Sequence, residues 1–450
     1  MSFSDDREEV SRGGRTLVVV LDDAAANRAR SGPGRDREGR LAEATGLALA
    51  IGVTIVDAVV LPLRRRTPAT LLGPGQVATL AERAAADEIE LVIVDASLTA
   101  IQQRNLEQAI GAKVIDRTAL ILEIFGERAA TAEGRLQVEL AHLDYQQGRL
   151  VRSWTHLERQ RGGFGFLGGP GETQIEADRR MIRDRMARLR RQLDDVSRTR
   201  GLHRERRRRA PWPVIALVGY TNAGKSTLFN ALAGGGAVAE DALFATLDPT
   251  MRRVAIDGVG TAIISDTVGF VSDLPTQLVA AFRATLEEVR AADLLLHVRD
   301  FSHSESHVQR EDVLAVLGEL GIGPLAEEAE AGPPILEVLN KIDGLSTEQR
   351  EAALAEAERS GAVAVSALSG EGLDQLRTRI AELLGGNSVE REVQLGAGEG
   401  ATLAWLYDHA QVIERRDEPD GGQRLQVRLS ALNDARLERR REQGASDAAL

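Results

Sequence analysis

The run Gly219–Ser226 combines residue types that could hold a phosphate chain. It reads GYTNAGKS, and the apolar stretch Val214–Val218 precedes it. Glycines let backbone N–H groups approach phosphate oxygens, and the amino end of a following helix adds its positive dipole. In this pattern Lys225 reaches the β- and γ-phosphates and the Ser226 hydroxyl binds Mg²⁺. The spacing therefore predicts a nucleoside-triphosphate site, the alternative being a plain glycine-rich turn.

Two further motifs follow apolar runs and add a metal ligand and a base reader. Asp266–Gly269 (DTVG) comes after Ala262–Ser265. Its carboxylate can reach the magnesium sphere, and the Gly269 N–H can sense the γ-phosphate. In Asn340–Asp343 (NKID), the Asp343 carboxylate can accept from N1–H and the N2 amino group of guanine. Adenine has an acceptor at N1 and lacks that amino group, so the carboxylate would be left unpaired. These motifs predict selectivity for guanine nucleotides.

Two weaker segments complete the predicted site. Ser366–Leu368 (SAL) would supply a backbone N–H to guanine O6, and the stem of Lys341 would lie along the purine face. Leu243–Asp248 (LFATLD) lies between the phosphate loop and DTVG, where the first switch loop belongs. Thr246 is the expected second hydroxyl on Mg²⁺, ordered by the γ-phosphate, and Thr250 is its rival.

The expected roles divide between chemistry and binding. Lys225, Thr246 and Gly269 are the expected catalytic residues, and Ser226 and Thr246 are the expected magnesium ligands. Only three of the 56 basic residues are lysines, and two of these three lie in the nucleotide motifs. An ammonium is more compact than a guanidinium and has a different donor geometry, which is consistent with lysine being retained at these two positions. The residues predicted to line the nucleotide are Gly219, Tyr220, Thr221, Asn222, Ala223, Gly224, Lys225, Ser226, Phe244, Ala245, Thr246, Leu247, Asp248, Asp266, Thr267, Val268, Gly269, Asn340, Lys341, Ile342, Asp343, Ser366, Ala367 and Leu368.

The order of these motifs is that of Ras-like GTPases, but one hydrolytic group is missing. Phe270 stands where a water-orienting glutamine often follows DTVG, and a phenyl ring neither donates nor accepts. We therefore expect slow intrinsic hydrolysis that a partner stimulates. Asn222 resembles the asparagine of GTPases that bind K⁺ between the phosphates; the alternative is that it stabilises the turn.

Composition narrows the class of protein. Hydrophobic residues make up 43% of the 450 and charged residues 28%, which is ordinary for a globular protein. With no cysteine, disulfides and thiolate metal sites are excluded. The polar, acidic N-terminus is unlike a signal sequence, and no apolar run of about 18 residues predicts a membrane span. We expect a cytoplasmic monomer, with partial membrane association left open.

Charge is distributed unevenly along the chain. Arg149–Arg209 contains 18 arginines and 8 acidic residues, a balance of +10, whereas the remainder carries −22 of the overall −12. A basic segment between acidic flanks suits a polyanion, and the alternative is a solvated helical face. Within it, Ile182, Met186, Leu189, Leu193 and Val196 have the spacing of a seam between two helices.

The elements that must position these groups indicate a multidomain α/β protein. Alternating strands and helices predict a mainly parallel sheet in both α/β parts. The expected segments are a disordered lead (1–14), an N-terminal α/β domain (15–125), a long antiparallel helical hairpin with a Gly-rich tip (126–210), a Ras-like P-loop G domain (211–385) and a small C-terminal α+β domain (386–450).

The chain resembles the HflX family of ribosome-associated bacterial GTPases over nearly its whole length. The runs that carry the resemblance are Asp116–Tyr145, Gly168–Arg180 (GGPGETQIEADRR), Gly219–Leu232, Leu243–Arg253 (LFATLDPTMRR) and Asp266–Asp300. The segment before GPGETQ departs from the simplest family pattern because GGFGFLG adds glycines and two aromatic residues.

This resemblance implies binding to the large ribosomal subunit, with the hairpin tip directed at rRNA near the peptidyl-transferase centre. It also implies that GTP hydrolysis is stimulated there and that stalled ribosomes are dissociated under stress. Phe164 and Phe166 at the tip could stack on bases or form an apolar cluster of their own. Three alternatives stay open: a GTPase that regulates a protein or membrane partner, an RNA-binding module with a vestigial nucleotide site, and a P-loop kinase that uses ATP.

Overall fold

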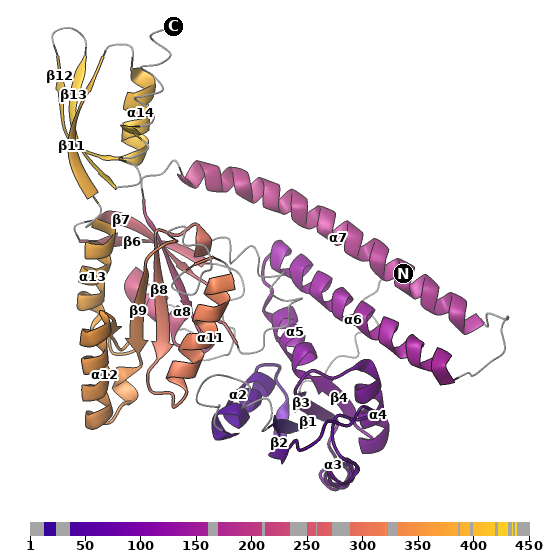
Figure 1. The fold of residues 1–450 in the computed structure, drawn as a ribbon. Coiled ribbons are helices and arrows are strands. Elements are labelled where there is room, and N and C mark those ends of the chain that lie inside the picture. The colour runs from indigo at the N-terminus through magenta and orange to yellow at the C-terminus, as the bar shows by residue number, and fades with distance from the viewer. Residues whose placement is uncertain are drawn as a thin grey trace.

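In the computed structural model, the described residues form three sheets and a pair of long helices (Figure 1). No helix in the part of the chain that it describes is long and apolar enough to cross a bilayer. The described residues are 13–23, 37–160, 170–208, 212–234, 250–257, 259–271, 289–319, 321–322, 332–385, 388–396, 399–418, 422–430, 434, 437 and 438.

The first sheet is parallel throughout, in the order β2-β1-β3-β4, as the sequence predicts. Leu80 and Leu106 of two helices pack with Val19 against one face of the sheet, and Leu47 and Phe125 of two others belong to a second cluster on its opposite face. The elements are β1 (Arg15–Asp22), α2 (Arg37–Leu49), β2 (Thr54–Pro62), α3 (Pro74–Ala86), β3 (Leu91–Asp95), α4 (Ala100–Ile110), β4 (Lys113–Asp116) and α5 (Arg117–Arg128).

Two long helices, α6 (Ala132–Gln160) and α7 (Pro170–Arg208), lie side by side and extend away from the sheets (Figure 1). Within the seam spacing found in the sequence, Met186 and Leu189 are buried. Arg185 of α7 also pairs with Glu139 of α6 at 2.6 Å. The Gly-rich stretch between the helices, with Phe164 and Phe166, lies outside the described residues.

The second sheet follows the order β10-β9-β8-β5-β7-β6, and only the edge strand β6 is antiparallel. Because the carboxyl ends of its parallel strands share one edge, the loops that carry the motifs meet there. The elements are β5 (Val214–Gly219), α8 (Lys225–Ala233), β6 (Thr250–Ile256), β7 (Gly260–Asp266), β8 (Leu294–Asp300), α11 (Ser306–Glu319), β9 (Ile335–Asn340), the 3₁₀ turn η1 (Ile342–Gly344), α12 (Thr347–Ser360), β10 (Val363–Ala364) and α13 (Leu373–Gly385).

The third sheet is antiparallel, in the order β11-β13-β12, and one helix packs against it. Its elements are β11 (Ser388–Leu395), α14 (Gly400–His409), β12 (Gln411–Asp417) and β13 (Gln423–Ser430). Leu406 of α14 and Leu425 and Val427 of β13 are fully buried in its small core. This part is therefore α+β, as predicted.

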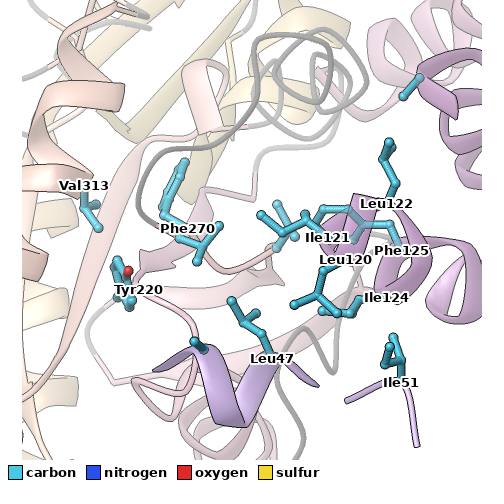
Figure 2. Close-up of a cluster of buried hydrophobic side chains, with 14 of the residues drawn as sticks. Leu47, Ile51, Leu120, Ile121, Leu122, Ile124, Phe125, Tyr220, Phe270 and Val313 are labelled. Carbon is cyan, nitrogen blue, oxygen red and sulfur yellow. The ribbon is translucent and has the colours of Figure 1, made fainter. Parts of the chain in front are cut away.

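A single apolar cluster joins the first sheet's helices to the second sheet (Figure 2). It contains Leu47 of α2 and Ile121 of α5 together with Val313 of α11. Tyr220 and Phe270, which follow β5 and the DTVG motif, belong to the same cluster. The two loops nearest the predicted phosphates therefore pack against the N-terminal α/β part of the chain.

Candidate guanine-nucleotide site

The phosphate loop connects β5 to α8, and its two glycines are required by close neighbours. Gly219 has φ +154°, and a Cβ there would lie 2.2 Å from the Val298 carbonyl oxygen. Gly224 is the N-cap of α8 with φ +87°, and a Cβ there would lie 2.3 Å from Nδ2 of Asn340. A side chain at either position is excluded by both space and backbone conformation.

Lys225 lies buried at the centre of this loop, with 6% of its surface exposed. Its Nζ donates to the carbonyl oxygens of Gly219 (3.1 Å) and Tyr220 (2.7 Å). Burial lowers the pKa of Lys225 to about 8; Asp266 acts in the opposite direction, and Lys341 lowers the pKa further. A buried ammonium with this shift is stabilised by added negative charge, which phosphate oxygens would supply.

The first turn of α8 and the end of β7 bring two oxygen ligands together. The Ser226 hydroxyl donates to Oδ2 of Asp266 at 2.7 Å. A hydroxyl and a carboxylate beside a phosphate loop suit Mg²⁺, which prefers oxygen and takes few protein ligands. The other expected ligand, Thr246, falls among residues 235–249, outside the described residues, as do Phe244, Ala245, Leu247 and Asp248.

The DTVG motif is joined to the phosphate loop by backbone hydrogen bonds. Phe270 N–H donates to the Gly219 carbonyl at 3.0 Å, and Thr221 N–H donates to the Phe270 carbonyl at 2.7 Å. A Cβ on Gly269 would lie 2.9 Å from Cα of Thr221 and 3.0 Å from Nζ of Lys225. Gly269 therefore lies directly beside the lysine that is expected to hold the phosphates, and the two residues before it, Thr267 and Val268, are buried.

At the other end of the site, Asn340 connects three loops. Its Nδ2 donates to the Ala223 carbonyl at 2.9 Å, and its Oδ1 accepts from Ala367 N–H at 3.0 Å. The side chain of Asp343, by contrast, is exposed on the turn η1. Ser366 is buried, whereas Leu368 is 81% exposed at the rim. Asn340 thus sets the separation between the phosphate loop and the loops predicted to bind the base.

The structure therefore brings the described part of the predicted site to one edge of the second sheet. It also adds a contact that the sequence did not predict. The hydroxyl of Tyr220 donates to Glu43 of α2 at 2.9 Å, and Glu43 in turn pairs with Arg117 of α5. Tyr220 and Glu43 are 177 residues apart, and the only local signal is an aromatic side chain in an otherwise small and polar loop.

A mainly parallel sheet, a GxxxxGKS loop at the start of a helix, DTVG and NKID define a P-loop GTPase domain. Four family models match the chain. They are described as "GTP-binding GTPase N-terminal" over residues 38–126, "GTP-binding GTPase Middle Region" over 128–207, "50S ribosome-binding GTPase" over 214–341 and "HflX C-terminal domain" over 352–449.

Curated relatives cover most of the chain. The GTPase HflX of Magnetococcus marinus is 51% identical over 380 residues, 84% of this chain and 86% of the relative. The GTPase HflX of Escherichia coli is 41% identical over 397 residues, 88% of this chain and 91% of the relative. This chain belongs to the HflX family of GTPases and is a GTP hydrolase. Among solved structures, SsGBP in complex with GDP aligns with a TM-score of 0.47 at 24% identity, over 82% of this chain and 98% of that chain.

Proposed function

We propose that this GTPase binds the large ribosomal subunit in its GTP-bound form and dissociates stalled ribosomes under stress. The observation that carries the proposal is the basic helix α7, which extends from the body beside α6 (Figure 1). The family model for residues 214–341, described as "50S ribosome-binding GTPase", supports the choice of partner. The chain would act in the cytoplasm as a monomer.

The exposed face of α7 suits a phosphate backbone. Arg180, Arg183, Arg190 and Arg191 are all exposed on it. Guanidinium groups bind phosphate oxygens through paired hydrogen bonds, which gives affinity with little sequence specificity. The helix pair would therefore contact rRNA along its length, and its tip would approach the peptidyl-transferase centre.

The described site residues have defined roles in this proposal. Lys225 would bind the β- and γ-phosphates, while Ser226 and Asp266 would hold Mg²⁺, which neutralises charge on the phosphates when bound. Asn340 fixes the loop on which Asp343 would accept from the guanine edge. Thr246 stays the proposed second magnesium ligand and catalytic residue.

Nucleotide state would reach the rest of the chain through the segment after DTVG. The γ-phosphate would recruit the Gly269 N–H, and the next residue, Phe270, lies in the apolar cluster with Ile121 of α5 and Leu47 of α2 (Figure 2). A packed core has discrete arrangements and does not deform continuously. Movement of Phe270 would therefore change how the N-terminal part and the helix pair are held against the GTPase domain.

Hydrolysis itself would be slow until the ribosome completes the site. Phe270 is 4% exposed and carries no group that could orient water. Asn222 is exposed in the phosphate loop with φ +60°, so its side chain is accessible to a K⁺ ion between the phosphates. We propose potassium stimulation as the intrinsic part of catalysis and the large subunit as the extrinsic part.

Co-sedimentation with isolated large subunits tests the proposal. The protein should sediment with a GTP analogue that cannot be hydrolysed, and far less with GDP or without nucleotide. The double variant Arg190→Ala/Arg191→Ala should bind more weakly. The slope of its affinity against salt concentration should also be smaller, by the equivalent of about two phosphate contacts. The matched control is Arg64→Ala/Arg65→Ala, which removes two exposed arginines from the N-terminal part.

Two results would contradict this function. Sedimentation that does not depend on nucleotide would remove the proposed switch. Unchanged binding and salt dependence in the α7 variant would exclude rRNA as the ligand of this helix. The second result would favour a GTPase that regulates a protein or a membrane surface.

A further inference from the structure

Asp300, the last residue of β8, pairs with the lysine of the NKID motif. Its Oδ2 lies 2.8 Å from Nζ of Lys341, which directly follows the neighbouring strand β9. Asp300 and Asn340 are register partners, and Phe301 N–H donates to the Asn340 carbonyl at 3.0 Å. The two loops are therefore bound together by backbone and side chain at the edge of the predicted base site.

The Asp300 carboxylate is held in place before any ligand binds. Its Oδ1 accepts from the backbone N–H of Ser302 at 3.0 Å and from the Ser302 hydroxyl at 2.6 Å. The residue is only 9% exposed. One oxygen thus belongs to the turn that follows β8, and the other is directed at Lys341. A carboxylate ordered in this way gives its partner a fixed position with little further loss of freedom.

Lys341 spans the distance between Asp300 and the phosphate loop. Its backbone has φ +66°, and its Cε lies 3.9 Å from the place that a Cβ on Gly224 would occupy. The aliphatic stem is therefore laid along the edge of the site, with 32% of the side chain exposed. The same lysine lowers the pKa of Lys225, so its charge is felt at the phosphate end.

We propose that Asp300 is a positioning residue for guanine-nucleotide binding, which holds the Lys341 ammonium so that its stem lies flat against the purine. This assignment rests on the proposed placement of the base beside Lys341. Without the pair, the long stem of Lys341 gains rotational freedom. Nucleotide binding would then have to order the Lys341 side chain, whereas the intact protein orders it on folding.

A purely structural role for Asp300, confined to the turn with Ser302, makes a different prediction. Asp300→Asn retains an acceptor oxygen for Ser302 but removes the negative charge that binds Lys341. Ser302→Ala removes one hydrogen bond to Asp300 and leaves the charge. If Asp300 acts in the turn alone, Ser302→Ala should weaken nucleotide affinity more than Asp300→Asn does. If Asp300 positions the lysine, Asp300→Asn should have the larger effect on affinity.

The experiment is a competition titration of the full chain against a fluorescent GDP analogue, with GMP, GDP and GTP as competitors. Asp300→Asn should raise all three dissociation constants by about tenfold and by similar factors, because the change acts at the base and not at the phosphates. Lys341→Met, which keeps the stem length, should have an effect of comparable size. The dissociation constants of the double variant should lie within about twofold of those of the weaker-binding single variant.

The outcomes separate this inference from the proposed site. If wild-type protein shows no preference for GDP over ADP, the base site itself is misplaced and the inference fails with it. If wild-type protein prefers GDP but the Asp300 and Lys341 effects are additive, only the positioning role is wrong. An Asp300→Asn protein that binds all three nucleotides as tightly as wild type overturns the inference as well.

Discussion

Gly224→Ala is the substitution for which the structure predicts the most specific result. Gly224 has φ +87°, and an alanine in this left-handed region costs about 1–2 kcal/mol. In addition, its Cβ would lie 2.3 Å from Nδ2 of Asn340, so the buried asparagine must move. That movement breaks two hydrogen bonds, to Ala223 and Ala367, which contribute about 0.5–1.5 kcal/mol each.

Gly224→Ala should also weaken nucleotide binding, because those two hydrogen bonds hold the phosphate loop against the loops that are predicted to bind the base. Two bonds at about 1–3 kcal/mol together, plus a misplaced loop, should weaken guanine-nucleotide affinity by about 100-fold or more. Fluorescence titration with a GDP analogue measures this affinity, and urea unfolding measures the stability cost separately.

Gly361→Ala is the matched control. Gly361 ends α12 with φ +72°, and no atom lies within 4 Å of a Cβ there. The two alanines should therefore share the backbone cost, and only Gly224→Ala should lose the nucleotide. If both variants bind GDP equally well, or both lose it, the assigned role of Asn340 in joining the loops is refuted.

Three further predictions concern single side chains. Affinity for GDP should change little between about pH 7 and the Lys225 pKa of about 8 and fall by about tenfold per unit above it, because the phosphates bind the protonated form of Lys225. A Lys225→Arg protein that still binds should lack this fall, and a sloped titration for it would contradict the assignment. Asp116→Asn should lower the free energy of unfolding by about 2–4 kcal/mol, since the buried carboxylate accepts from backbone N–H groups and from Arg149 at 2.8 Å. Asp57 is half-exposed and pairs with Arg83, so Asp57→Asn should lower the free energy of unfolding by less than about 1 kcal/mol, and equal losses would argue against the buried network. Asn222→Ala should abolish any excess of the hydrolysis rate in potassium over sodium, and equal wild-type rates in the two salts would exclude a potassium site.

Much of the fold follows from local pattern. Apolar runs such as Val214–Val218, each placed before a motif, predict the strands of the second sheet, and parallel strands bring their following loops to one edge. In the C-terminal part, local pattern indicates fewer strands than the structure contains. Only the run Leu425–Leu429 (LQVRL) has a strand-like pattern there, whereas the described residues form three strands, because β11 and β12 carry charged side chains on an exposed face. Pairs such as Glu390–Arg428 across β11 and β13 need the fold to be recognised.

The site divides in the same way. The loops around Lys225 and Asp343 carry motifs whose residue types and spacing are informative within a few positions. The contacts of Asp300 with Lys341, and of Glu43 with Tyr220, join residues that are far apart in the chain, so no local pattern contains them. Thr246 and the domain limits stay predictions, as the first switch loop lies outside the described residues.

Base recognition by Asp343 is the claim on which the assignment of the site depends, and one substitution tests it directly. Asp343→Asn replaces one acceptor by a donor, which no longer suits the N2 amino group of guanine but suits the O2 carbonyl of xanthine. Titration with GTP and xanthosine triphosphate should show affinity for GTP falling by about 100-fold or more while xanthosine triphosphate gains by a similar factor. An Asp343→Asn protein that binds GTP as tightly as wild type, or that gains nothing with xanthosine triphosphate, would contradict it.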